Sequence, residues 1–173
     1  INAQLNQIAR LNREIQVQEA SGQDASALRD DAHRTLVELS ESIGARAVRD
    51  DNGQIMVFVG NSAVVNGATA RDILAEHDAE GNIELRLSGA SSIVLNTQIQ
   101  SGRVAAMLRT REDTIPNVLS SLDALAYHMA SEVNAVHRQG FGLDDTTGLD
   151  LFNLPPAEAG AAGKLEVNQI LLD

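Results

Sequence analysis

Over the first 44 residues, apolar side chains recur with the period of an α-helix, in two stretches separated by a short polar connection. The first stretch has a heptad seam with one polar core position: Ile1, Leu5, Ile8, Asn12 and Ile15. The second has similar spacing and stops at a glycine: Leu28, Ala32, Leu36, Leu39, Ile43 and Gly44. The tetrapeptide SGQD lies between them, and Asp24 or Ser26 is the expected N-cap of the second helix. The two stretches therefore predict an antiparallel helical hairpin.

The period changes between about Ala45 and Gln98. Runs with strand propensity lie on both sides of Asp51-Asn52-Gly53, and an Asn-Gly pair in this setting is a strong signal for a β-hairpin. Further short apolar runs, punctuated by glycine and asparagine, are expected to be strands: Val64-Val65, the alternating Ile83, Leu85 and Leu87, and Ile93-Val94. This segment predicts a small antiparallel β unit.

Helical spacing returns after Gly102. Pro116 interrupts it, because proline has no N–H group, so the helix is expected to kink there or to restart with Pro116 in its first turn. Beyond the proline, apolar residues repeat at alternating spacings of three and four: Leu119, Leu122, Ala126, Met129, Val133 and Val136. This is the most regular pattern in the chain, and we expect these side chains to lie in the core of the protein.

Together the patterns predict an α+β protein: an elongated antiparallel helical bundle or coiled-coil rod, with a small antiparallel β lobe inserted between the second and third helices. We expect a helical hairpin at 1–44, a β subdomain at 45–98 and a long helix packed on the hairpin at 99–140. Residues 141–173 should form a turn, a linker rich in proline, alanine and glycine, and the start of a further segment. Because the chain opens at Ile1 inside a helical pattern and ends on NQILLD, we interpret it as a piece of a longer protein.

Charge and composition exclude several classes of function. The chain has 24 acidic and 13 basic residues and a formal net charge of −11, which disfavours binding to the phosphate backbone of nucleic acids. It has no cysteine, and therefore no disulfide, zinc–thiolate site or cysteine nucleophile. No apolar run approaches the roughly 20 residues that span a bilayer, so no membrane span is expected.

The histidines offer little chemistry. His128 and Glu132 stand one helical turn apart, which a metal site could use, but no third ligand follows at a motif spacing. Two polar residues on a solvated face are the favoured interpretation. His137 lies at the end of the predicted helix, where an interaction with the last carbonyl groups and the helix dipole is favoured over catalysis. Asn12 is interpreted as a buried asparagine that fixes helix register.

The loop after the last predicted helix contains Asp144, Asp145 and Asp150, which raises the question of calcium. The first two are adjacent and no late bidentate glutamate follows, so the ligands do not alternate as a calcium loop requires. A turn in which Asp and Gly adopt left-handed conformations is favoured instead. Phosphate-loop, dinucleotide-loop and nucleophile-elbow motifs do not occur. The sequence thus predicts no catalytic, cofactor-binding or metal-binding residues.

Two long segments are similar to a known family. Residues 1–44 resemble the paired helices of the bacterial flagellar hook-associated protein 1 family, and residues 96–152 resemble its long helix and the turn after it. The matching positions, in order, are Gly102, Arg111, Pro116, Leu122, Leu125, Asn134, His137, Gly140, Phe141, Thr147, Gly148 and Phe152. The segment LEVNQILLD also resembles the family. Departures at Ala32, Gly142 and Asp145 alter a salt bridge and the loop geometry without changing the helical seam.

The resemblance implies a structural, non-enzymatic subunit that joins the flagellar hook to the filament and needs no cofactor. It implies export through the hollow flagellum to the outside of the cell. The implied partners are further copies of the same subunit in a ring, the hook protein and the neighbouring junction protein. An export chaperone is expected to bind the terminal region, which this sequence lacks.

Three alternatives stay open at the level of sequence. The first is another flagellar axial protein, either flagellin-like or hook-type, which would form long polymers. The second is a non-flagellar extracellular coiled-coil adhesin or adaptor, whose loss would leave swimming normal. The third is a metal hydrolase that uses His128 and Glu132, which alanine substitutions would inactivate.

Overall fold

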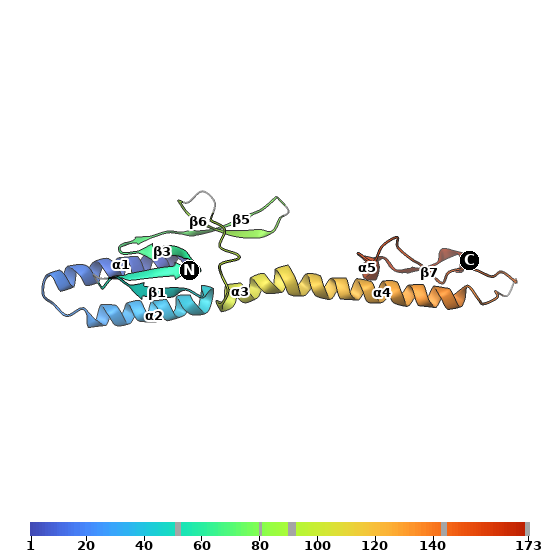
Figure 1. Cartoon of the computed structure of the whole chain (residues 1–173), viewed down its shortest axis with the longest axis horizontal. Coiled ribbons are helices and arrows are strands. Elements are labelled where there is room, and N and C mark those ends of the chain that lie inside the picture. The colour runs from blue at the N-terminus through green and yellow to red at the C-terminus, as the bar shows by residue number, and fades with distance from the viewer. Residues whose placement is uncertain (51–52, 80, 90–92, 143–144, 172–173) are drawn as a thin grey trace. The chain divides into compact units, whose positions relative to one another are not determined.

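The computed structural model describes residues 1–50, 53–79, 81–89, 93–142 and 145–171 (Figure 1). The chain divides into two compact units, Ile1–Arg109 and Thr110–Asp173. The predicted α+β class is confirmed, since the chain has helices together with small antiparallel sheets. The finer division at residues 44, 98 and 140 stays a prediction.

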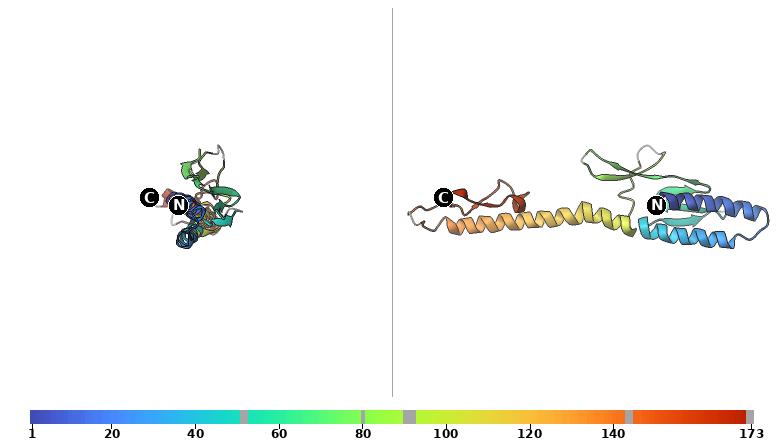
Figure 2. Two further views of the ribbon diagram at one scale, coloured as in Figure 1. Left: turned by 90° about the vertical axis from the view of Figure 1, so that its left-hand side faces the viewer. Right: turned by 180° about the vertical axis from the view of Figure 1, so that it is seen from behind.

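The first unit opens with α1 (Asn2–Ala20) and α2 (Ser26–Ile43), which lie side by side and antiparallel; Figure 2 shows the pair from behind. In the seam of α1 only Ile1 is exposed. Gly44 ends α2 with φ at +67°, a left-handed conformation that glycine adopts without steric cost.

The start of α2 differs from the prediction, because Ala25 occupies the N-cap position in place of Asp24 or Ser26. The Asp24 carboxylate still accepts hydrogen bonds from the hydroxyl and the N–H of Ser26, at 2.6 and 3.1 Å. The hydroxyl bond, and after it the N–H bond, lowers the pKa of the Asp24 carboxyl group. The aspartate therefore organises the turn before the helix rather than its first residue.

A four-stranded antiparallel sheet follows, in the order β1 (Arg46–Arg49), β2 (Ile55–Val59), β3 (Ser62–Asn66), β4 (Thr69–Ala70). Alternate residues of β2 are buried, so one face of this strand turns to the core. The predicted hairpin is confirmed, with Arg49 opposite Ile55. Asp51 and Asn52 of its turn lie outside the described residues, and Gly53 has φ +77°.

Strands β5 (Ile73–His77) and β6 (Ile83–Leu87) form a separate antiparallel pair. The prediction of a strand at Ile93-Val94 is wrong, because the structure has only an isolated β-bridge there, between Val94 and Arg86. The amide of Asn96 occupies the next main-chain groups of β6, accepting from the Leu85 N–H at 2.8 Å and donating to the Ile83 carbonyl at 2.9 Å. A side chain thus takes the place of a continuing strand.

One apolar cluster joins α1 and α2 to the sheet. Its most deeply buried members come from every layer of the unit: Leu5, Ile8, Leu39, Ile43, Val57, Val59, Val64, Val65 and Leu95. α1 packs on β3 and β4, and α2 contacts β1. Burial of these aliphatic side chains is the main favourable term for this unit.

Asn12 lies at the border of this cluster and is 1% exposed. Its amide donates to the carbonyls of Ile55 and Gly67, both at 2.8 Å, and accepts from the Ile55 N–H at 3.0 Å. The asparagine is buried, as expected, but its partners are main-chain groups of the sheet. The predicted role in helix register is therefore wrong, and Asn12 instead fixes α1 to the sheet.

The helix α3 (Gly102–Arg109) closes the first unit by packing against α2. Gly102 has φ +85°, and a Cβ atom there would lie 2.8 Å from the Gly44 nitrogen. Glycine is required at this contact for both reasons, because a side chain would be strained and would collide with the main chain of the turn after α2.

The second unit begins with a π-helix, η1 (Thr110–Thr114), and continues with α4 (Ile115–His137). Pro116 lies in the first turn of α4, as one of the two expectations had it, but Thr114 before it has helical φ and ψ, so the helical conformation continues from η1 into α4 without a break. β7 (Phe152–Asn153) and β8 (Glu166–Val167) form an antiparallel pair, and α5 (Ala161–Lys164) and η2 (Gln169–Leu171) are short helical turns. The segment from β7 onward lies along α4 (Figure 1).

The role of Asn12 can be tested by replacing it with alanine. Asn12→Ala leaves the buried Ile55 N–H without its partner, and we expect it to lower the free energy of unfolding by about 2–3 kcal/mol. Asn6→Ala is the matched control, because Asn6 is exposed on the same helix, and it should change stability by less than about 0.5 kcal/mol. Urea unfolding followed by far-ultraviolet circular dichroism measures both; equal losses would contradict the assignment.

Candidate functional site

The regular apolar pattern on α4 is not buried in the described structure. Leu119, Leu122, Met129 and Val136 are exposed, with Leu122 at 48% and Val136 at 71%, while Ala126 and Val133 are half-buried. The prediction that these residues form an intramolecular core is thus wrong for the described residues. Periodicity identifies an apolar side of a helix, but it does not reveal whether another element covers that side.

Three further apolar side chains are exposed as well: Ile115 and Val118 extend this surface toward the start of the helix, and Leu125 lies between Leu122 and Met129. We call the whole set the α4 face: Ile115, Val118, Leu119, Leu122, Leu125, Met129 and Val136. Three residues of the face and three polar neighbours line a shallow hollow of about 480 Å³: Val118, Leu122 and Leu125 with Thr114, Asn117 and Ser121. Spacings of three and four residues, with few charges between them, suit the packing of another α-helix.

The other sides of α4 are held by the C-terminal segment. The amide of the buried Asn134 donates to the Phe152 carbonyl and accepts from the Phe152 N–H, both at 2.9 Å. The carboxylate of Asp123 accepts from the N–H groups of Gly160 and Ala162, at 2.7 and 2.9 Å. These contacts fix the segment against the helix and leave the α4 face exposed.

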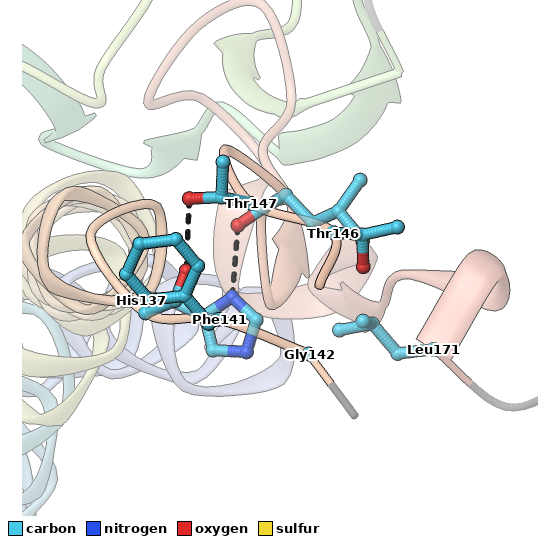
Figure 3. Close-up of a pocket in the computed structure, with 8 residues that line it drawn as sticks. His137, Phe141, Gly142, Thr146, Thr147 and Leu171 are labelled. Atoms are coloured by element: carbon cyan, nitrogen blue, oxygen red, sulfur yellow. Dashed lines mark hydrogen bonds between the residues drawn. The ribbon is translucent and has the colours of Figure 1, made fainter. Parts of the chain in front are cut away.

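At its C-terminal end, α4 is tied to the loop that follows (Figure 3). The Nδ1 atom of His137 lies 2.8 Å from the Leu149 carbonyl, so its partner is in the loop. The sequence had suggested a different partner, the last carbonyl groups of the helix. The hydroxyl of Thr147 instead donates to the carbonyls of Gly140, at 2.9 Å, and Arg138, at 3.3 Å. Thr147 therefore ties the loop to the end of the helix, a role that the sequence analysis did not assign to it.

A cavity of about 350 Å³ opens between this loop and the helix end. His137, Thr146, Thr147 and Leu171 lie around it in Figure 3, together with Phe141, which is 78% exposed. Among the described residues of its lining, one has an ionisable side chain, His137, whose Nδ1 atom lies against the Leu149 carbonyl. This composition provides apolar contact and no arrangement for acid–base chemistry.

The aspartate loop forms a turn. Asp145 has φ +62° and Gly148 has φ +81°, which confirms that Asp and Gly adopt left-handed conformations here, while Asp144 lies outside the described residues. Asp150 binds Arg138 through an ion pair of 2.5 Å. Across the described part of the chain, no group of three or more His, Cys, Asp or Glu side chains is arranged to hold a metal.

His128 and Glu132 are not brought together as a site. The Nε2 atom of His128 lies 3.2 Å from a Glu158 carboxylate oxygen. Helical spacing alone could not identify this partner, because Glu158 belongs to the linker that folds back onto α4. That the chain has no catalytic, cofactor-binding or metal-binding residue stays a prediction.

Exposure of the α4 face has a direct consequence for stability. Leu122→Ala should change the free energy of unfolding by less than about 0.5 kcal/mol, because the side chain is exposed and alanine favours the helix. Leu39→Ala in α2 removes a fully buried side chain and should cost about 2–5 kcal/mol. Fluorescence of Tyr127, the single tyrosine, reports the unfolding of α4, and far-ultraviolet circular dichroism reports the loss of helix in the whole chain, so both signals are followed for both variants. A loss at Leu122 as large as that at Leu39 would show that the face is buried.

Comparison with known proteins places the chain in a family. Residues 1–152 match the family described as the flagellar hook-associated protein FlgK helical domain. The structure of the flagellar hook junction protein FlgK from Burkholderia pseudomallei is similar, with a TM-score of 0.67 and 24% sequence identity. The similarity covers 89% of this chain and 29% of that one, and at this identity it shows the fold alone.

The remaining comparisons add two findings. A comparison with curated protein sequences gives no significant match. Among the described residues, none of the helices is both long and apolar enough to cross a membrane. Because the family match spans residues 1–152 of 173, the chain belongs to the FlgK family of flagellar hook-associated proteins, whose members are structural components of the bacterial flagellum.

Proposed function

We propose that the protein to which these residues belong joins the flagellar hook to the filament as a structural subunit. Family membership supports this role, and the similar protein from Burkholderia pseudomallei is named a flagellar hook junction protein. The chain spans 29% of the length of that protein, so the proposal concerns more than the residues described here. The observation that favours a structural role is the α4 face, an apolar helical surface that the described residues leave uncovered.

In this proposal, other α-helices of the assembled axial structure pack on the α4 face. Seven partly exposed aliphatic side chains favour association, because burial of apolar area stabilises by about 25 cal/mol per Å². Their spacing allows side chains of a second helix to insert between them. The C-terminal segment is bound to the other sides of α4, so it does not cover the face.

The further partners follow from the proposed place in the flagellum. Copies of the subunit associate in a ring and contact the hook protein on one side and the next junction protein on the other. The protein is exported through the flagellar channel, and an export chaperone binds its terminal region. Its role is mechanical, to match two tubular lattices, and it requires neither a cofactor nor catalysis.

The structural context supports this over an enzymatic role. The side chains of His128 and Glu158 lie against each other on the exposed surface, and not in a cleft with Glu132. Family membership likewise favours a flagellar role over a non-flagellar adhesin or adaptor. A flagellin-like or hook-type role differs from the proposal in one property that can be observed, since those subunits build long polymers.

Disruption of the gene tests the proposed role. Cells without the protein should have bare hooks in electron micrographs and should release unpolymerised flagellin into the medium, because the filament has no surface on which to begin. Restoration of the full-length gene is the control and should return filaments and swimming. Normal filaments in the disrupted strain would contradict the proposal, and loss of the hook itself would favour a hook-type protein.

Complementation with altered genes tests the α4 face. Leu122→Asp combined with Met129→Asp places two charges on the face, so full-length protein with both changes should restore less than about one tenth of wild-type swimming, because a buried charge disfavours helix packing. Val17→Asp with Val37→Asp is the matched control, since both valines are exposed on α1 and α2, outside the face. Immunoblots of the culture medium confirm export of each variant. Equal swimming of the two double variants would remove the face from the assembly.

A further inference from the structure

The helical segment between α3 and α4 contains a five-residue π-helix, Thr110–Thr114. In a π-helix the hydrogen bonds join residues five apart, so the turn is wider than an α-helical turn and contains an extra residue. Such turns are rare, and they recur at positions where a helix bends. The sequence reasoning anticipated a kink or a restart at Pro116 but not a change in helix type.

Pro116 supplies the local cause. In a regular α-helix the N–H of residue 116 would donate to the carbonyl of Glu112, but proline has no N–H, and its ring would collide with that carbonyl. The wider turn moves the carbonyl away from the ring. The π-helix is therefore a response to a proline two residues beyond its end, and it should depend on that proline.

Packing does not hold this turn in place. All five residues of η1 are exposed, whereas α3 buries Ala105 and α4 buries Ala130 and Asn134. The boundary between the two compact units falls at the first residue of η1, between Arg109 and Thr110. Residues 115–122 of α4 are exposed as well, so what distinguishes the turn at Thr110–Thr114 is its π geometry and its place at the boundary between the units.

We propose that Thr110–Thr114 is a hinge, at which the helical segment bends in solution, and that Pro116 maintains it. The hinge does not depend on the proposed place of the protein at the hook–filament junction. Bending at one π turn requires no loss of buried contact, because none of the side chains in that turn is buried.

Spin-label distances test the hinge in the 173-residue chain. The chain has no cysteine, so two introduced cysteines define each pair without side reactions. Met107→Cys with Leu125→Cys spans η1, and Val118→Cys with Val136→Cys lies within α4. Both pairs are separated by 18 residues, or about 27 Å in a straight α-helix. All four positions are between 53% and 71% exposed, which permits labelling without damage to a core.

Double electron–electron resonance on frozen samples gives the width of each distance distribution. We expect the pair that spans η1 to have a distribution at least twice as wide as that of the pair within α4. Pro116→Ala restores the missing N–H and removes the ring. It should therefore narrow the distance distribution of the pair that spans η1 to the width found for the pair within α4. Pro156→Ala, in the exposed linker after β7, is the matched proline control and should leave the width unchanged.

Two results would overturn the hinge. One is a distance distribution for the pair that spans η1 that is, in the wild-type chain, as narrow as that of the pair within α4. The other is a distance distribution for the spanning pair whose width Pro116→Ala leaves unchanged, because the bending would then not depend on the proline. Circular dichroism establishes that the Pro116→Ala chain is folded, and the pair within α4 provides the same control on the helix itself.

Discussion

Primary amides of asparagine hold the helices and loops to the strands, and much of this structure depends on that interaction. An amide has both a donor and an acceptor, so it can satisfy the N–H and C=O of a strand residue as a neighbouring strand would. Asn12 does this at Ile55 and Asn134 does it at Phe152. Asn2 makes the same pair of bonds with Ile73, at 3.0 and 2.9 Å. Each amide replaces a strand that the short sheets do not provide.

The interaction explains how small sheets pack beside helices without unsatisfied polar groups. A buried main-chain group without a partner costs about 1–3 kcal/mol, which short strands could not tolerate at several positions. Within the described residues, every buried side-chain nitrogen or oxygen has a hydrogen-bond partner. On the edge of β6 that does not pair with β5, the amide of Asn96 binds Ile83 and Leu85, and the main-chain pairing there is limited to the bridge between Arg86 and Val94.

In the second unit, hydrogen bonds between α4 and the C-terminal segment determine which side of the helix stays exposed. Asn134 and Asp123 bring the C-terminal segment onto particular sides of α4, and the apolar residues on its remaining side stay exposed in the described structure. With 2% aromatic residues, the chain relies on aliphatic side chains and alanine for its packing. We propose that this uncovered row of apolar side chains is the surface on which other helices of the flagellar structure pack.

The sequence by itself determined the helices, the first hairpin, the glycine that ends α2 and the place of Pro116 in the first turn of α4. These features depend on side-chain period and on the conformational limits of glycine and proline, which are local properties. It also showed that α4 has a regular apolar side. Only the tertiary structure decided that Leu122 and Met129 are exposed while Asn134 is buried, that Asn12 binds a strand, and that His128 meets Glu158. Burial and hydrogen-bond partners depend on segments far apart in the chain, and periodicity contains no information about which of them will meet.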